Sequence, residues 1–285
     1  MEISTVAYAA KIIEDSINPV GKRLTTFEIT FPRIVLAELN THRLFSRNSA
    51  SSRAIPVAKM LERVKTDPFI PVWWGKNQKG MQAAEELTGW HLEQAQRDWL
   101  SARDKMVEKV EHLQNLDVHK QIANRLLEPW LWHTAIVSAT DYGNFFAQRC
   151  DPMAQPEIRV VAEMMRDLYF TSTPNPLEPG QWHLPYTTAE DRAEARERDI
   201  DIRSISVARC ARVSYLSQDG IRDLSEDVRM YNRLTTGGHW SPFEHVAYAK
   251  CDASWSGNFA GFSQYRKAFA GEMRSYELPK ETAIG

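Results

Sequence analysis

The side chains best suited to chemistry in this 285-residue sequence are concentrated between residues 41 and 53. This segment, Thr-His-Arg-Leu-Phe-Ser-Arg-Asn-Ser-Ala-Ser-Ser-Arg, holds three arginines, one histidine and five hydroxyl-bearing side chains. Guanidinium groups, hydroxyls and loop amides are the groups that hold phosphate oxygens in proteins. The segment therefore indicates either an anion site or, as is usual for an isolated run of charges, a solvated basic surface with capping serines.

A second group surrounds Arg149, which follows Asn-Phe-Phe and precedes the segment Ala154 to Arg159. Arg149 comes just before a helix start that we expect at Pro156, a location that favours anions. The alternative role is a surface ion pair, which contributes little stability. The neighbouring Cys150 would have its thiol pKa lowered by Arg149. Because unpaired cysteines are more often small buried residues, we assign Cys150 no nucleophilic role.

Two further segments carry polar side chains at close spacing. Gly238 to His245 contains His239 and His245, but no third ligand has suitable local spacing, so we predict no metal site. Between residues 206 and 215, arginines alternate with small residues.

The elements that must position these groups follow from hydrophobic spacing. Phe27, Ile29 and Phe31 alternate along a strand over residues 23–31 that Pro32 ends. A helix from residue 34 to about 45 places Glu38 on one face with residues 41 and 42. The other expected elements are a short strand or helix within 3–17, helices over 92–113, about 118–128, 156–168 and 224–234, and a strand over 243–249.

Long helices with a few strands predict an α+β fold, which we expect to be a single domain over residues 1–285. Residues 170–200 contain a proline-rich internal linker, and residues 65–85 form a loop around Trp73-Trp74. This loop is either a lid over a substrate or, as we favour, ordinary surface packing.

Composition excludes several classes of protein. A formal net charge of −2 gives no global attraction to nucleic acid or to an anionic membrane. Three cysteines without a CxxC pair exclude a disulfide scaffold and a standard zinc site. No stretch is apolar enough for a membrane span, and no secretory signal is evident at the start of the sequence. We therefore expect a cytoplasmic protein that binds neither membrane nor nucleic acid.

Taken together, these segments resemble the flavin-dependent thymidylate synthases. The family's arginine-rich motif, followed at fixed distances by Asn, Ser and Arg, is similar to Thr41–Arg43 with Asn48, Ser51 and Arg53. The other matching segments are Asn124 to Pro129, Arg149 with Ala154 to Ile158, Ala211 to Ser214, and Gly238 to His245. In typical members the last two segments come first, so the resemblance implies a permuted motif order on a fold of long helices packed on a small, mainly antiparallel sheet.

The resemblance implies conversion of the pyrimidine deoxynucleotide monophosphate dUMP to dTMP. Methylenetetrahydrofolate would be the carbon donor, FAD the cofactor and NADPH the reductant, in a homo-oligomer, as a tetramer. No enzyme nucleophile is required in this chemistry, so the protein supplies positioning and electrostatics. Arg149 would face the pyrimidine as the catalytic residue and stabilise negative charge at N3 and O4.

The same resemblance assigns the remaining positions. The substrate-binding residues would be Glu38, Ser49, Ser51, Ser52, Arg53, Arg125 and Arg149. The FAD-binding residues would be Thr41, His42, Arg43, Asn48, Asn144, Ser214, His239 and Ser241.

Three departures from the family pattern bear on the substrate. Thr41 replaces an arginine, Ser49 replaces a glutamate, and Glu38 replaces a glutamine. Either the carboxylate has moved across the same pocket, or the base differs, since a carboxylate can accept from the cytosine amino group. The second possibility gives an alternative function, FAD- and folate-dependent methylation or hydroxymethylation of dCMP or dUMP. A noncatalytic phosphate- or nucleic-acid-binding module is a further alternative, which the near-neutral charge disfavours.

Overall fold

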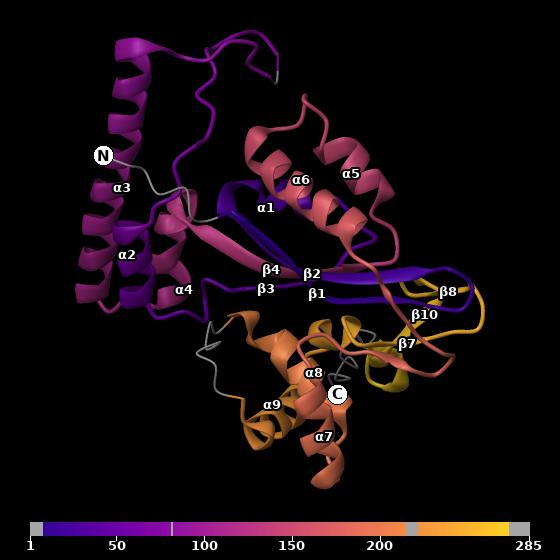
Figure 1. Ribbon diagram of the computed structural model, residues 1–285. Helices are drawn as coiled ribbons and strands as arrows, with labels where there is room; N and C mark the ends of the chain where they lie inside the picture. Colours follow the sequence, from indigo (N-terminus) through magenta and orange to yellow (C-terminus); the bar gives the residue numbers. More distant parts are fainter. Residues whose placement is uncertain (1–7, 81, 215–221, 274–285) are drawn as a thin grey trace, which may run out of the picture.

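A five-stranded sheet forms the centre of the computed structural model, which describes residues 8–80, 82–214 and 222–273 (Figure 1). Its strands are β1 (Ala9–Ile17), β2 (Arg23–Pro32), β3 (Ser46–Ser49), β4 (Trp132–Ala139) and β5 (Asn175–Pro176), in the order β3-β4-β2-β1-β5. The short β1–β5 pair is parallel and the others are antiparallel. A mixed helix and sheet protein with a small, mainly antiparallel sheet is thus confirmed, and β3 is an edge strand.

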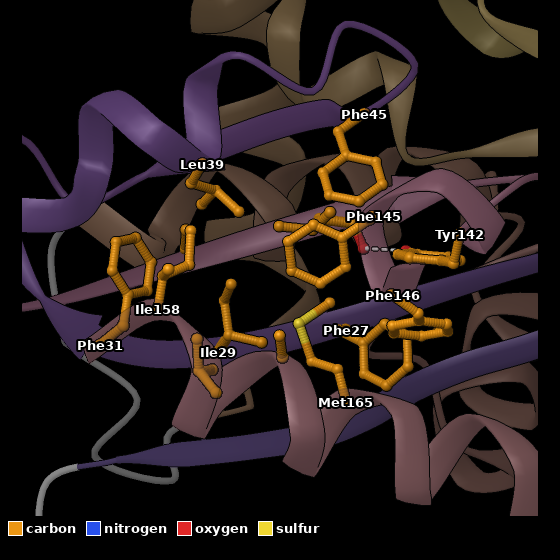
Figure 2. Close-up of a cluster of buried hydrophobic side chains, with 14 of the residues drawn as sticks. Phe27, Ile29, Phe31, Leu39, Phe45, Tyr142, Phe145, Phe146, Ile158 and Met165 are labelled. Atoms are coloured by element: carbon orange, nitrogen blue, oxygen red, sulfur yellow. Dashed lines mark hydrogen bonds between the residues drawn. The ribbon is translucent and has the colours of Figure 1, made fainter. Parts of the chain in front are cut away.

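One face of this sheet carries the largest apolar core. The helices α5 (Gly143–Arg149) and α6 (Pro156–Thr171) cover it, together with the 3-10 turn η1 (Arg33–Val35) and α1 (Leu36–Asn40) (Figure 1). As the alternation predicted, Phe27, Ile29 and Phe31 all point into this core. Figure 2 shows their packing against Phe145 and Met165, whose helices come from the middle of the sequence.

The C-terminal part of the chain covers the opposite face. Its helices are α7 (Ala189–Glu197), α8 (Ile202–Ala211) and α9 (Leu224–Gly237), with 3-10 turns η3 (Arg212–Ser214), η4 (Ser241–Glu244) and η5 (Tyr265–Ala268). A three-stranded sheet of β6 (Trp182–His183), β7 (Ala247–Ala249) and β10 (Phe262–Gln264) and a hairpin of β8 (Trp255–Ser256) and β9 (Phe259–Ala260) complete this half (Figure 1). The expected strand over 243–249 is therefore shorter, because residues 241–244 form a 3-10 turn.

A third group of helices lies beyond the end of the sheet where β4 begins (Figure 1). It consists of α2 (Val57–Thr66), α3 (Gly89–Asn115), α4 (Lys120–Ala123) and the 3-10 helix η2 (Asn124–Trp130), around its own apolar cluster. The single helix expected over 118–128 is instead α4 followed by η2, which continues through Pro129. In the described residues, no helix is long and apolar enough to cross a membrane.

The Trp73-Trp74 loop reaches across to the turn that follows Arg149. Trp74 packs edge-on against Trp99 of α3, and Gly75 pairs with Glu86 in an isolated bridge. Near its tip, the side-chain amide of Gln82 donates to the backbone carbonyl of Met153.

Candidate functional site

The helix expected from residue 34 to 45 ends at Asn40, so that residues 41–45 turn the chain into β3. In this turn the rings of His42 and Phe45 are buried and pack against Phe145. Arg47 stabilises the turn by donating to the backbone carbonyls of Leu39 and His42, both at 3.2 Å. The predicted loop after the helix thus begins as an edge strand.

Side chains alternate across β3 and so reach both faces of the sheet. Arg47 points to the α1 side, whereas Asn48 donates to the carbonyl oxygen of Cys210, at the end of α8, at 2.7 Å. The η4 turn packs against the same strand. Segments from both ends of the sequence therefore flank β3.

Arg149 lies against residues 38–42, and we call Arg149, His42, Thr41 and Glu38 the Arg149 cluster. Its Nε donates to Nε2 of His42 at 2.9 Å. Its second terminal nitrogen donates to the Thr41 hydroxyl at 3.1 Å and to the Glu38 carbonyl at 3.4 Å. The structure thus brings together four residues that were predicted to bind substrate or cofactor, from segments more than 100 positions apart.

His42 is neutral in this cluster. Burial, followed by the charges of Arg149 and Arg47, lowers its pKa to about 4. A neutral imidazole can accept the hydrogen bond from Arg149, whereas a protonated one has no acceptor nitrogen. The guanidinium is therefore held in one orientation by a group that does not neutralise its charge.

The side chain of Glu38, whose backbone carbonyl accepts from Arg149, has no hydrogen-bond partner at one carboxylate oxygen. Its Oε2 is buried, and no described residue donates to it. A buried acceptor without a donor costs free energy, so this oxygen is available to accept a hydrogen bond from water or a ligand. This position is the one at which the chain departs from the family glutamine.

A second group, which we call the Glu128 cluster, contains Glu128, Arg125, Arg33 and Ser52. One oxygen of the Glu128 carboxylate, Oε1, accepts from Arg125 at 2.7 Å, from Arg33 at 3.3 Å and from the Ser52 hydroxyl at 3.3 Å. Asn124 fixes the loop by donating to the carbonyls of Ser52 and Ile55 at 2.7 and 3.0 Å. Ser52 and Arg125, both predicted substrate-binding residues, are thus neighbours.

One hollow borders this cluster, and a second hollow shares part of its lining. The smaller, of about 30 Å³, is lined by Arg33, Ser52, Arg63 and His133 among others. The larger, of about 210 Å³, is also lined by Arg63 and lies by Trp130 and Trp132. Burial and Arg33 lower the pKa of His133 to about 3, so this ring is neutral and accepts from Arg33 at 3.2 Å.

The two clusters lie at opposite ends of one segment, residues 33–42. At the rise of 1.5 to 2 Å per residue in helical backbone, they are on the order of 15 Å apart. In the described residues Arg149 and Arg125 donate to different partners, and neither hollow is lined by Arg149, Arg125 or Arg53.

The other predicted site residues lie at the surface or serve the fold. Arg43, Arg53, His239 and Ser241 are exposed, and their side chains make no hydrogen bond within the described residues. Asn144 is exposed and accepts from Gln148. Ser49 and Ser51 are partly buried, and the side chain of Ser214 lies outside the described part of the structure.

One interpretation, that of Cys150, needs correction. Burial raises the pKa of the Cys150 thiol, and the opposing charge that reaches it comes from Arg166 rather than Arg149. The arginines of the segment 206–215 are structural, because Arg209 pairs with Asp191 and Asp227, and Arg212 also pairs with Asp227.

Sequence reasoning missed Arg33, Glu128, Arg47 and Arg63. The available signals were weak. Arg33 directly follows the proline that ends β2. Glu128 lies within the segment Asn124 to Pro129, which resembles the family. The family motif has no defined residue at its position, so the motif suggested no role for it. Arg63 occurs on an ordinary amphipathic helix, and only its place at both hollows sets it apart.

Fold and site together define a mixed helix and sheet protein with two cationic clusters at the ends of one helical segment. The sequence model of the family described as thymidylate synthase complementing protein matches residues 19–175, more than half of the chain. The chain therefore belongs to the flavin-dependent thymidylate synthase family.

Solved structures and curated proteins were also compared. The chain is similar to the UMP/dUMP methylase PolB from Streptomyces cacaoi bound with 5-Br UMP, at 15% identity and a TM-score of 0.46, over 57% of this chain and 88% of that chain. The same methylase bound with 5-Br dUMP gives 20% identity and a TM-score of 0.40, over 52% of this chain and 65% of that chain. No curated protein matches the chain.

Proposed function

We propose that this protein converts dUMP to dTMP, with methylenetetrahydrofolate as carbon donor and FAD, reduced by NADPH, as cofactor. Family membership supports the reaction class. The observation that carries the proposal is the hydrogen bond from Arg149 to His42, which joins two family motifs into one polar cluster. In the reaction the C5 proton of uracil would be lost, and the methylene carbon would pass from the folate nitrogens to C5 with release of tetrahydrofolate. A hydride from the reduced cofactor would then convert this carbon to methyl.

In this proposal the Arg149 cluster receives the pyrimidine. The guanidinium would face N3 and O4 and stabilise the negative charge that develops as C5 becomes nucleophilic. His42 helps by holding Arg149 without neutralising it. The phosphate would lie at the other end of the segment, with Arg125, Ser51, Ser52 and the exposed Arg53.

The residues around β3 fit a flavin nucleotide. Arg43 is exposed and has no ion-pair partner among the described residues, so its charge is available to bind a diphosphate. His239 and Ser241, on the other side of the strand, are exposed polar side chains that make no hydrogen bond within the described residues. When bound, FAD supplies the hydride. We propose that Thr41, His42, Arg43, Asn48, Asn144, Ser214, His239 and Ser241 hold it.

The packing of the C-terminal half against β3 also supports a permuted motif order. The segments at 211–214 and 238–245 follow the rest of the sequence, yet Asn48 bonds to Cys210 and Ser138 bonds to His245 at 2.8 Å. Motifs that lie far apart along the chain therefore meet at the same strands.

A second candidate is modification of dCMP, and the buried Oε2 of Glu38 favours it. A carboxylate can accept from the N4 amino group of cytosine, whereas O4 of uracil has no hydrogen to donate. If cytosine is the base, Glu38→Gln should lower kcat/KM for dCMP by about tenfold and leave the KM for methylenetetrahydrofolate unchanged.

The product assay separates the candidates. The purified protein should show a flavin absorption band and, with methylenetetrahydrofolate and NADPH, convert dUMP to a product with the mass of dTMP. Methylated or hydroxymethylated dCMP without dTMP would overturn the first candidate. A colourless protein that binds phosphate without turnover would favour a binding module instead.

A further inference from the structure

Three donors of the Glu128 cluster converge on a single oxygen atom. Arg125, Arg33 and Ser52 belong to three different segments, yet each donates to Oε1 of Glu128. One oxygen that accepts from two guanidinium groups and a hydroxyl has the surroundings of a phosphate oxygen. An internal carboxylate therefore occupies an anion-binding arrangement.

The other contacts of Arg33 orient its guanidinium group toward Glu128. One terminal nitrogen reaches Glu128 and the other donates to the neutral ring of His133 at 3.2 Å. Its side chain is 19% exposed. Because His133 carries no charge, Glu128 is the carboxylate that pairs with Arg33 among the described residues. Removal of that partner would leave a cation directed at the same point.

A hollow lies beside two of these donors, Arg33 and Ser52, which both line it. It is also lined by Arg63, a half-buried arginine that makes no hydrogen bond with a described residue. The Glu128 side chain is 24% exposed, so it has a route toward solvent.

We propose that Glu128 occupies the phosphate site of this protein, and that Arg33 is a further phosphate-binding residue. The phosphate of the substrate displaces the Glu128 carboxylate and takes over the donors of Arg33, Ser52 and Arg125. The identity of the substrate as a nucleoside monophosphate rests on the proposed function, whereas the anion site rests on the contacts alone. Displacement of one carboxylate favours a dianionic phosphate over singly charged anions.

Calorimetric titration of the full chain with inorganic phosphate and with dUMP tests this. Glu128→Gln removes the competing charge, so both ligands should bind about tenfold more tightly, equivalent to about 1.4 kcal/mol. Deoxyuridine, which lacks the phosphate, should bind equally to both proteins. Arg33→Gln should weaken phosphate and dUMP by about tenfold. Glu226→Gln is the matched control, because Glu226 pairs with Arg229 three positions away on the exposed face of α9.

Unchanged or weaker phosphate binding in Glu128→Gln would overturn the inference, because Glu128 would then merely orient the arginines. Failure of phosphate to bind either protein would also overturn it. If phosphate responds as expected but dUMP binds no better than phosphate, the anion site stands and the proposed substrate fails. Should Glu128→Gln not fold, Glu128→Asp withdraws the carboxylate by one methylene and should also tighten phosphate binding.

Discussion

Arg149 is the residue on which the proposed chemistry depends, and its contacts explain why it can act on a ligand. Its partners in the Arg149 cluster are an imidazole, a hydroxyl and a backbone carbonyl, none of them charged. A guanidinium without a carboxylate partner keeps its full charge for stabilising a developing anion.

We expect Arg149→Ala to lose about 100-fold or more in turnover while the protein retains its flavin, because the proposed role of Arg149 is on the pyrimidine. Steady-state kinetics and the flavin absorption band measure the two effects. Arg159→Ala, which removes a partly buried arginine of neighbouring α6, should leave both unchanged. Loss of the flavin from the Arg149 variant would contradict this role.

Among the elements, α7, α8 and α9 are held together by buried charges. Asp227 on α9 is fully buried and pairs with Arg209 at 3.0 Å and with Arg212 at 2.8 Å. Arg209 also pairs with Asp191 on α7 at 2.6 Å. These ion pairs hold the C-terminal helices in place on the second face of the sheet.

Asp227→Asn should therefore lower the free energy of unfolding by about 3 to 5 kcal/mol, because it leaves buried arginine charge uncompensated. Urea denaturation followed by circular dichroism measures this. Glu226→Gln, one position earlier on the exposed face, should change stability by less than about 0.5 kcal/mol. Equal stability of the two variants would show that the buried pairs contribute no net stabilisation.

A second buried network links strands from both halves of the chain. His183 bonds to Ser16 and Thr26, Thr26 bonds to Ser138, and Ser138 bonds to His245. Burial lowers the pKa of His183 and of His245 to about 3. Both rings are therefore neutral in the folded protein, and the network favours neutral histidines.

For the molecule as a whole, these histidines predict instability in acid. His42, His133, His183 and His245 have folded pKa values of about 3 to 4, below the unfolded value of 6.5, so the unfolded chain binds more protons. Their stabilisation is complete above pH 6.5 and is lost as the pH falls toward 4. Burial raises the pKa of Glu14 to about 7, so the folded protein binds one proton there that the unfolded chain does not. This proton opposes the effect of the histidines.

On unfolding, the chain therefore takes up a net three protons. The free energy of unfolding should fall by about 4 kcal/mol per pH unit between pH 6 and 5. Urea denaturation across this range measures the slope. His183→Gln should reduce the slope by about 1.4 kcal/mol per pH unit, since one proton fewer is taken up on unfolding. A stability independent of pH in this window would contradict the assigned neutral rings.

The assembly is a further property of the whole molecule. By resemblance to the family we propose a homotetramer with sites between subunits, which would allow a second copy to complete the space between the Arg149 and Glu128 clusters. Light scattering coupled to size-exclusion chromatography should give a mass near four times 32.7 kDa. A monomer with full activity would contradict the proposal.

Local sequence patterns determined the long helices, the buried alternation of β2 and the start of α6 at Pro156, because periodicity and capping act over a few residues. They also gave the prediction, which stays a prediction, that residues 41–53 carry phosphate-binding groups. They did not give the turn over residues 41–45, in which His42 and Phe45 pack against Phe145, about 100 residues away. Likewise, only the folded chain places Arg33 and Ser52 on Glu128 and Arg149 on His42, since contacts between distant segments depend on how the whole chain packs.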